Sequence, residues 1–161
     1  MLFRDKGNEI LAAMNGRAVA IGDVEEPIFA GKVVGDGVAI IPASGEAVAP
    51  ISGIVSFVGE QKHTYGITGF DGVEILLHIG IDTVKLNGEG FECKVKKGDK
   101  VTAGDLLCVV DLDLLRKKNF DTTSPLVITS GSIDKVKRLT LRTGQVAAGQ
   151  TVVMRYTLAK Q

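Results

Sequence analysis

The strongest constraint on the fold is a predicted β-hairpin between residues 63 and 81. Residues 73–81 (VEILLHIGI) are mostly aliphatic or β-branched, which favours a strand, and residues 63–68 (HTYGIT) form a weaker strand pattern. Asp71-Gly72 lies between them and is a strong hairpin signal. Because side chains alternate along a strand, one aliphatic face must be covered by a core. We expect this face to consist of Val73, Ile75, Leu77, Ile79 and Ile81.

The hairpin carries His63 and His78, the two histidines of the chain. If the loop has four residues (69–72), His63 lies directly opposite His78, with Cβ atoms about 5 Å apart. If the turn has two residues (71–72), His63 lies opposite Gly80, and His78 is one diagonal step away, roughly 7–8 Å. Both registers predict that the two imidazoles share the face that points away from the core.

Paired imidazoles can serve several purposes. Two unrelated surface histidines would be ordinary, but Leu76 on the same face suggests a contact surface. A neutral imidazole near pH 7 is a nucleophile that can accept a phosphoryl group, and the second ring can stabilise it. Zinc is an alternative, but a closed site needs four ligands. We therefore expect no intrinsic metal site, although His63 and His78 could join a zinc site that a partner completes.

Five runs of residues together resemble one known family. The run LLHIGIDTVKLNGEGF resembles the phosphohistidine signature of glucose-type enzyme IIA domains of the bacterial phosphoenolpyruvate:sugar phosphotransferase system. The resemblance covers the chain from about residue 15 to its end. The matching runs, in chain order, are KVVGDGVAIIP (32–42), VAPISGIVSFV (48–58), KHTYGI (62–67), LLHIGIDTVKLNGEGF (76–91) and VKKGDKVTAGDLLCVVDLDLL (95–115).

The resemblance implies a phosphoryl relay without a cofactor. His78 would take phosphate on Nε2 from the phosphohistidine of the carrier protein HPr and pass it to a cysteine of a IIB domain, for sugar uptake. His63 would stabilise the phosphoryl group. The chain departs from the family pattern at Ile79, where phenylalanine is usual, and at Gln61, where threonine is usual. Because a glutamine amide can also donate and accept hydrogen bonds, we expect Gln61 to replace the threonine in orienting a ring.

A docking face for these partners is expected around the histidines. The resemblance places Asp36 and Val38 on it, and Gly80 would let a partner's backbone approach closely. Leu76 and Val84 would form an apolar collar, and Asp82 could pair with a basic partner. Regulatory target proteins would be further partners. A regulatory binding module that uses the same face without phosphoryl turnover is the alternative function.

The fold is predicted to be all-β, an antiparallel sandwich or flattened barrel with short helical turns. Similar half-units at 49–55, 95–107 and 141–153 suggest an internal duplication. They also resemble biotinyl or lipoyl carrier domains, but residues 111–116 offer no lysine for modification. We expect a flexible tail at residues 1–14 and a single domain at 15–161.

Composition excludes several other classes. Nineteen basic and 19 acidic residues balance, so neither nucleic acid nor an anionic membrane is an expected partner. Neither a membrane-spanning run nor a signal peptide is recognisable, which predicts a cytoplasmic protein without stable membrane insertion.

Cys93 and Cys108 are expected to be reduced and structural. A short helical turn is predicted at 113–119, with Asp113 as its N-cap.

Overall fold

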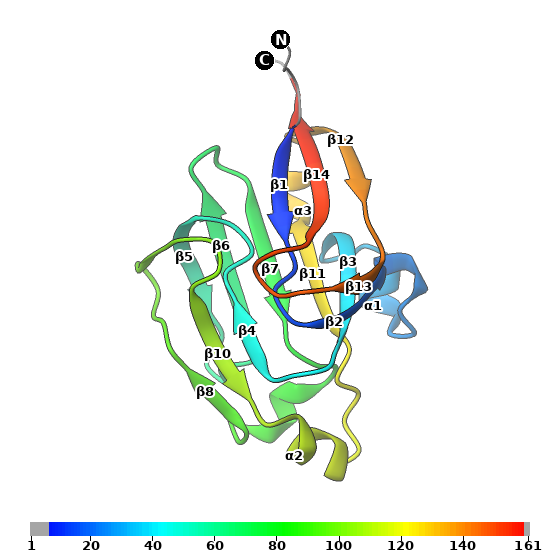
Figure 1. Ribbon diagram of the computed structural model, residues 1–161, viewed down its shortest axis with the longest axis vertical. Helices are drawn as coiled ribbons and strands as arrows, with labels where there is room; N and C mark the ends of the chain where they lie inside the picture. The colour runs from blue at the N-terminus through cyan, green and yellow to red at the C-terminus, as the bar shows by residue number, and fades with distance from the viewer. Residues whose placement is uncertain (1–6, 160–161) are drawn as a thin grey trace.

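The computed structural model describes residues 7–159 and consists of three antiparallel sheets around one main core (Figure 1). The large sheet contains, in spatial order, β13 (Gly144–Val146), β2 (Gly16–Ala20), β3 (Gly35–Pro42), β11 (Ser124–Thr129), β7 (Glu74–His78), β6 (Thr64–Gly69), β5 (Gly53–Val58) and β9 (Lys100–Val101). The small sheets are β1 (Asn8–Leu11), β14 (Val152–Leu158) and β12 (Val136–Leu141), and β4 (Glu46–Val48), β10 (Leu106–Val110) and β8 (Phe91–Cys93). The predicted all-β antiparallel fold is confirmed.

The helical segments are short, as expected. They are η1 (Ile21–Asp23), α1 (Pro27–Ala30), η2 (Thr83–Leu86), α2 (Leu112–Lys117) and α3 (Ser130–Ile133). Helix α2 lies at the end of the molecule opposite the free ends of β1 and β14 (Figure 1). Its N-cap is Asp111 rather than Asp113, because the Asp111 carboxylate accepts the Leu114 N–H at 3.1 Å.

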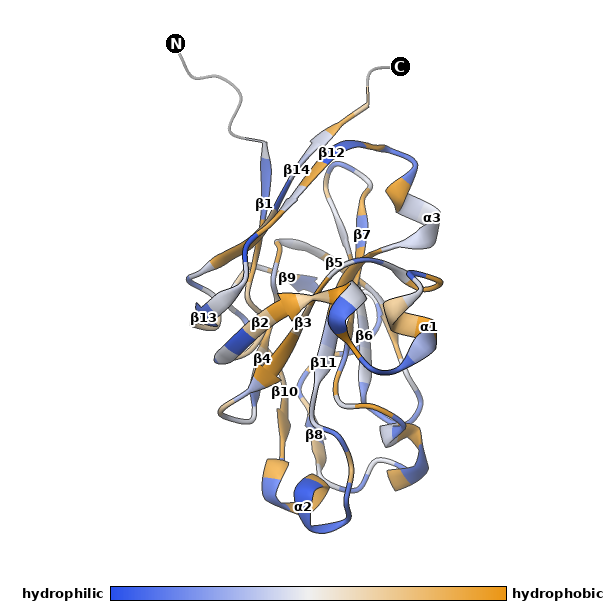
Figure 2. Ribbon diagram, turned by 90° about the vertical axis from the view of Figure 1, so that its right-hand side faces the viewer, coloured by the Kyte–Doolittle hydropathy of each residue, from blue (hydrophilic) through white to orange (hydrophobic). Residues whose placement is uncertain are grey.

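The aliphatic face of the hairpin lies in the core, as predicted. Val73, Ile75, Leu77 and Ile79 are at most 1% exposed. Figure 2 shows hydrophobic segments concentrated in the middle of the molecule, including β3 and β4. Ile81 differs from the prediction, because it lies beyond the end of β7 and packs against a second apolar cluster on the other face of the sheet.

That second cluster covers the face that the sequence assigned to solvent. Its buried members are Ile21, Val24, Phe29, Ala39 and Val127. The segment of η1 and α1 thus packs over β3, β11 and β7, and Leu76 is half-buried against it. Strand β11 is therefore buried on both faces, which agrees with its continuous apolar run Pro-Leu-Val-Ile.

The hairpin has a register that neither sequence alternative predicted. Thr68 pairs with Glu74 and Thr64 with His78, so both proposed registers are wrong by one residue. The Gly69 N–H donates to the Val73 carbonyl at 2.9 Å, which leaves a three-residue loop at 70–72. Gly72 has φ +86°, a conformation that glycine adopts without strain, and such loops commonly end in a left-handed residue.

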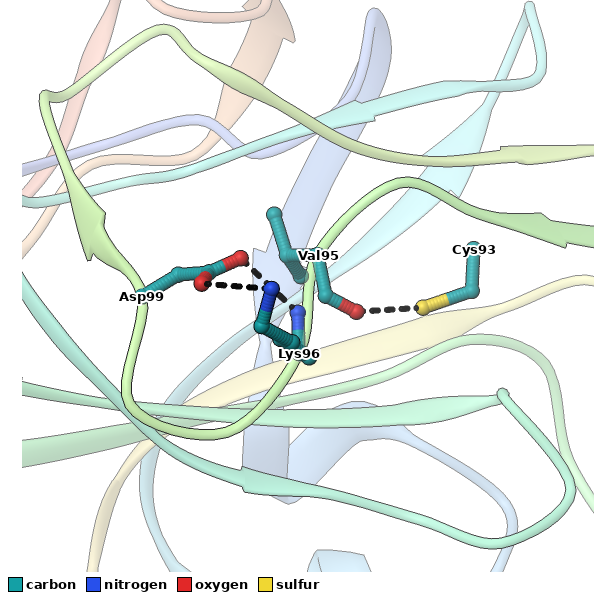
Figure 3. A network of polar contacts seen from close by, with 4 residues as sticks. All are labelled: Cys93, Val95, Lys96 and Asp99. Atoms are coloured by element: carbon teal, nitrogen blue, oxygen red, sulfur yellow. Dashed lines mark hydrogen bonds and ion pairs between the residues drawn. The ribbon is translucent and has the colours of Figure 1, made fainter.

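Two tight turns within residues 95–107 have the same construction. In residues 96–99 the Lys96 N–H donates to the Asp99 carboxylate at 3.0 Å (Figure 3), and in residues 102–105 the Thr102 N–H donates to Asp105 at 2.8 Å. Each turn has a glycine with positive φ directly before the aspartate, at 98 and 104. The shared Gly-Asp pattern therefore encodes a turn.

The cysteines are free thiols, as predicted. Cys93 on β8 lies opposite Cys108 on β10, and the Cys93 thiol donates to the Val95 carbonyl at 2.9 Å (Figure 3). Cys108 is fully buried, and burial raises the pKa of its thiol to about 11. Both cysteines pack with the main core, which fits a structural role.

The boundary predicted at residue 15 is wrong for the described part of the segment 1–14. Residues 8–11 form β1, which pairs with β14, and Ile10, Ala12, Ala13 and Met14 are fully buried. A strand as short as β1 gives only a weak pattern in the sequence. Its partner β14 lies near the other end of the chain, so the local sequence does not indicate that the two pair. Residues 1–6 lie outside the described residues.

Substitution of Ile10 by alanine should lower the free energy of unfolding by about 2–5 kcal/mol, because it leaves a cavity in the core. Urea denaturation at pH 7 measures this. The matched control is Ile28→Ala, since Ile28 is 49% exposed and its loss should cost well under half as much. Equal effects of the two substitutions would contradict the placement of residues 8–14 in the core.

Candidate functional site

The two histidines meet at the end of the hairpin, as predicted. Their ring centroids are 4.9 Å apart, with an interplanar angle of 81°. By the register of the hairpin, His63 lies opposite Ile79, whose N–H donates to the His63 carbonyl at 2.7 Å. The register alone would therefore direct the His63 side chain to the core side of the sheet. The rings still converge because β6 begins only at Thr64, so His63 lies outside the regular alternation, directly after Lys62 with φ +65°.

A hydrogen bond defines the tautomer of His78. Nδ1 lies 2.7 Å from the Gly80 carbonyl oxygen. Because a carbonyl only accepts, Nδ1 must carry the proton, and in the neutral ring the lone pair is on Nε2. Gly80 has φ +75°, and a Cβ atom there would lie 2.5 Å from Thr83 Cγ2. Glycine at position 80 is therefore required by the chain's own packing.

Both imidazoles are neutral at pH 7. Burial, with a smaller contribution from nearby His78, lowers the pKa of His63 to about 4, and the Gln61 carbonyl opposes this. Burial also lowers the pKa of His78, while Gly80, Glu26 and Asp82 act in the opposite direction. A neutral His78 with a free Nε2 lone pair is a competent nucleophile.

Aromatic rings enclose the pair. Phe29 lies edge-on to His78 with centroids 5.1 Å apart, and Phe91 lies 6.4 Å from His63. Phe29 belongs to α1, which starts with Pro27 and is capped by the Glu26 carboxylate at 3.0 Å from the Phe29 N–H. Phe29 was not among the predicted site residues, because the residues between Pro27 and Gly31 carried no expected role. The Glu-Pro helix start was the available signal.

The predicted docking residues have different environments. Asp82 is exposed, Val84 is 48% exposed, and Asp36 is half-buried and 3.6 Å from Lys32 Nζ. Val38 is fully buried in the main core, so its predicted contact with a partner is wrong. Gly80 is also buried, and Thr83 and Asp121 of the same chain fill the space beside it.

Gln61 lies in a turn rather than on β6. The turn is closed by the Lys62 N–H, which donates to the Gly59 carbonyl at 2.9 Å. The expectation that strand alternation directs Gln61 to the histidine face is therefore wrong. Its neighbour His63 has a buried Nδ1 atom that lacks a hydrogen-bond partner within residues 7–159.

Two negative findings concern residues 7–159. They contain no group of three or more His, Cys, Asp or Glu side chains placed to hold a metal ion. Within the same range, none of the helices combines the length and the apolar character that crossing a membrane requires.

Residues 8–133 match the family described as phosphoenolpyruvate-dependent sugar phosphotransferase system, EIIA 1. The chain belongs to this family. It is 41% identical over 152 residues to the glucose-specific EIIA component of Buchnera aphidicola, covering 94% of this chain and 93% of that protein. The solved glucose permease IIA from Mycoplasma capricolum superposes with a TM-score of 0.84 at 39% identity, covering 96% of this chain and 99% of that one.

Other EIIA relatives are parts of longer proteins. The glucose-specific EIICBA component of Streptococcus pneumoniae is 43% identical over 151 residues, which are 93% of this chain and 20% of that protein. The family and the matches over the whole length of single EIIA components together show a glucose-type EIIA component. Its role is that of a phosphoryl carrier in a sugar phosphotransferase system.

The low pKa of His63 predicts a pH effect on stability. Between pH 6.5 and about 4 the unfolded chain protonates His63 while the folded EIIA component keeps it neutral. The free energy of unfolding should therefore fall as the pH decreases through this window, by about 3 kcal/mol in total from this group.

The measurement is urea denaturation of wild type and His63→Gln from pH 7 to 4. The carboxylates titrate in both proteins, so the difference between the two curves isolates His63. Wild type should lose more stability than the variant. Parallel curves would show that His63 is readily protonated in the folded state.

Proposed function

We propose that the chain carries its phosphoryl group on Nε2 of His78, receives it from the phosphohistidine of HPr, and passes it to a cysteine of a IIB domain in the cytoplasm. The main support is the 2.7 Å contact between His78 Nδ1 and the Gly80 carbonyl, because it leaves Nε2 unprotonated. The family membership and the EIICBA relatives, whose names join the EIIA part to B and C components, support the partners.

The proposed step exchanges one nitrogen–phosphorus bond for another. The Nε2 lone pair attacks phosphorus while the bond to the donor histidine breaks. Nδ1 keeps its proton throughout and donates it to the Gly80 carbonyl in a hydrogen bond. In onward transfer a thiolate attacks phosphorus, and His78 returns to its neutral Nδ1–H form. Because phosphoryl transfer has a loose transition state, the protein contributes mainly positioning and charge stabilisation.

His63 would stabilise the transferred group. Within residues 7–159 the buried Nδ1 of His63 makes no hydrogen bond, and in the tautomer with the proton on Nε2 the ring presents an N–H donor. That N–H could donate to a phosphoryl oxygen beside His78, whose ring is 4.9 Å away. The negative charge of the phosphoryl group would raise the pKa of His63 from its low value and strengthen this bond. We assign Gln61 the role of supplying a hydrogen-bond donor to His63 Nδ1.

The surroundings suit a labile nitrogen–phosphorus bond. Phe29, Phe91 and half-buried Leu76 form an apolar collar that limits access of water. Exposed Ile28, Val33 and Val84, at 49, 62 and 48%, offer apolar contacts on the segments beside the histidines. Asp36 and Asp82 add acidic groups for basic partners. Regulatory target proteins could use the same surface, and one that supplied further ligands could complete a zinc site.

Incubation with phosphoenolpyruvate, enzyme I and HPr should add one phosphoryl group, labile to acid and stable to base. Mass spectrometry measures it. His78→Ala should take none, because it lacks the nucleophile. Thr64→Ala, which alters the residue paired with His78, is the control and should still be labelled. Full labelling of His78→Ala would overturn the assignment.

His63→Gln should accept phosphate from HPr but pass it slowly to a IIB domain, because the variant loses the imidazole donor. Gln61→Ala should slow the same step about three- to tenfold, the effect of one hydrogen bond. Rapid-quench measurement of onward transfer tests both. Onward rates equal to wild type would show that neither side chain stabilises the phosphoryl group.

A further inference from the structure

Residues 121–124 hold the peptide that fixes His78. The Gly80 N–H donates to the Ser124 hydroxyl at 3.1 Å, and the Ile81 N–H donates to the Asp121 carbonyl at 2.9 Å. The Gly80 carbonyl, which accepts from His78 Nδ1, lies between these two N–H groups. The position of the acceptor therefore depends on a segment more than 40 residues away in the sequence.

The Ser124 side chain accepts the hydrogen bond that the Gly80 N–H donates. It is fully buried at the start of β11. Its hydroxyl donates to the Thr122 carbonyl at 2.9 Å, so both hydrogen-bonding capacities are used and its direction is set. Buried polar groups with all partners present hold a unique geometry.

We infer that Ser124 is a positioning residue for His78, which acts through Gly80 to keep the His78 proton on Nδ1 and the Nε2 lone pair free. Without the hydroxyl, the buried Gly80 N–H loses its hydrogen-bond acceptor among residues 7–159. The Gly80 peptide would then move to find one and draw its carbonyl away from Nδ1. The imidazole could adopt the other tautomer, in which Nε2 is protonated and cannot attack phosphorus. The consequence for transfer rests on the proposed function, but the consequence for the tautomer does not.

The chain offers a matched control at the other end of β7. Ser132 in α3 is 5% exposed, and its hydroxyl accepts the Glu74 N–H at 3.0 Å. This bond holds the first residue of β7, whereas Ser124 holds the residues after its last one. Ser132→Ala removes the same kind of bond at a distance from His78. A loss of stability alone would affect both variants, but a change of tautomer should occur only in Ser124→Ala.

The decisive experiment is NMR of protein with ¹⁵N-labelled histidine near pH 7.5, which reports the proton on each ring nitrogen. Wild type and Ser132→Ala should show His78 with the proton on Nδ1, and Ser124→Ala should show a mixture of tautomers. Ser124→Thr keeps the hydroxyl and should restore the wild-type signal. A wild-type tautomer in Ser124→Ala, or an equal shift in Ser132→Ala, would overturn the inference.

Phosphorylation by HPr provides a second measurement. Ser124→Ala should accept phosphate about three- to tenfold more slowly than Ser132→Ala, the effect of one hydrogen bond. ³¹P NMR should also show part of the phosphate on Nδ1. If wild type takes no phosphate, the proposed function fails, while the tautomer comparison still decides the role of Ser124. Equal rates in the two variants would contradict a role in transfer.

Discussion

The site depends on one hydrogen bond, from His78 Nδ1 to the Gly80 carbonyl at 2.7 Å. This bond forms because β7 ends at His78 and the chain turns back at Gly80, where φ is +75°. A side chain at position 80 would collide with Thr83. The turn therefore requires glycine at this position, and the tautomer of His78 depends on the turn. In a regular strand through residue 80, the Gly80 carbonyl would point to a neighbouring strand. The His78 imidazole would then have no acceptor that fixes its proton on Nδ1.

The sheet gives this bond a rigid base. β7 lies between β6 and β11 in the large sheet, and its aliphatic face is fully buried. The opposite face is covered by η1 and α1, which bring Phe29 against the His78 ring at 5.1 Å. A side chain at the end of such a strand has few conformations, and the proposed phosphoryl transfer, which relies on positioning, would benefit from that restriction. Burial also lowers the pKa of both imidazoles and keeps them neutral at pH 7.

The hairpin shows which structural features can be predicted from a local sequence pattern. The two strands, the turn at 71–72 and the core face of β7 follow from alternation and from a turn signal, and they were predictable. The register was not, because loops of two, three and four residues all fit the same sequence, and the observed three-residue loop lies between the alternatives. The two histidine rings are still in contact, because His63 lies before the first residue of β6. The alternation of side chains along the strand therefore does not determine the direction of its ring.

The sequence by itself therefore determined the all-β class, the hairpin, the pair of histidines and the family, because these depend on residues close together in the chain. The tertiary structure decided what surrounds the pair. Phe29, Ser124 and the strand at 8–11 reach their contacts only when distant segments pack, as in the 44-residue separation of Gly80 and Ser124. Burial of Val38 and the proton on His78 Nδ1 are likewise results of packing, because a local pattern does not specify which segment covers a given face.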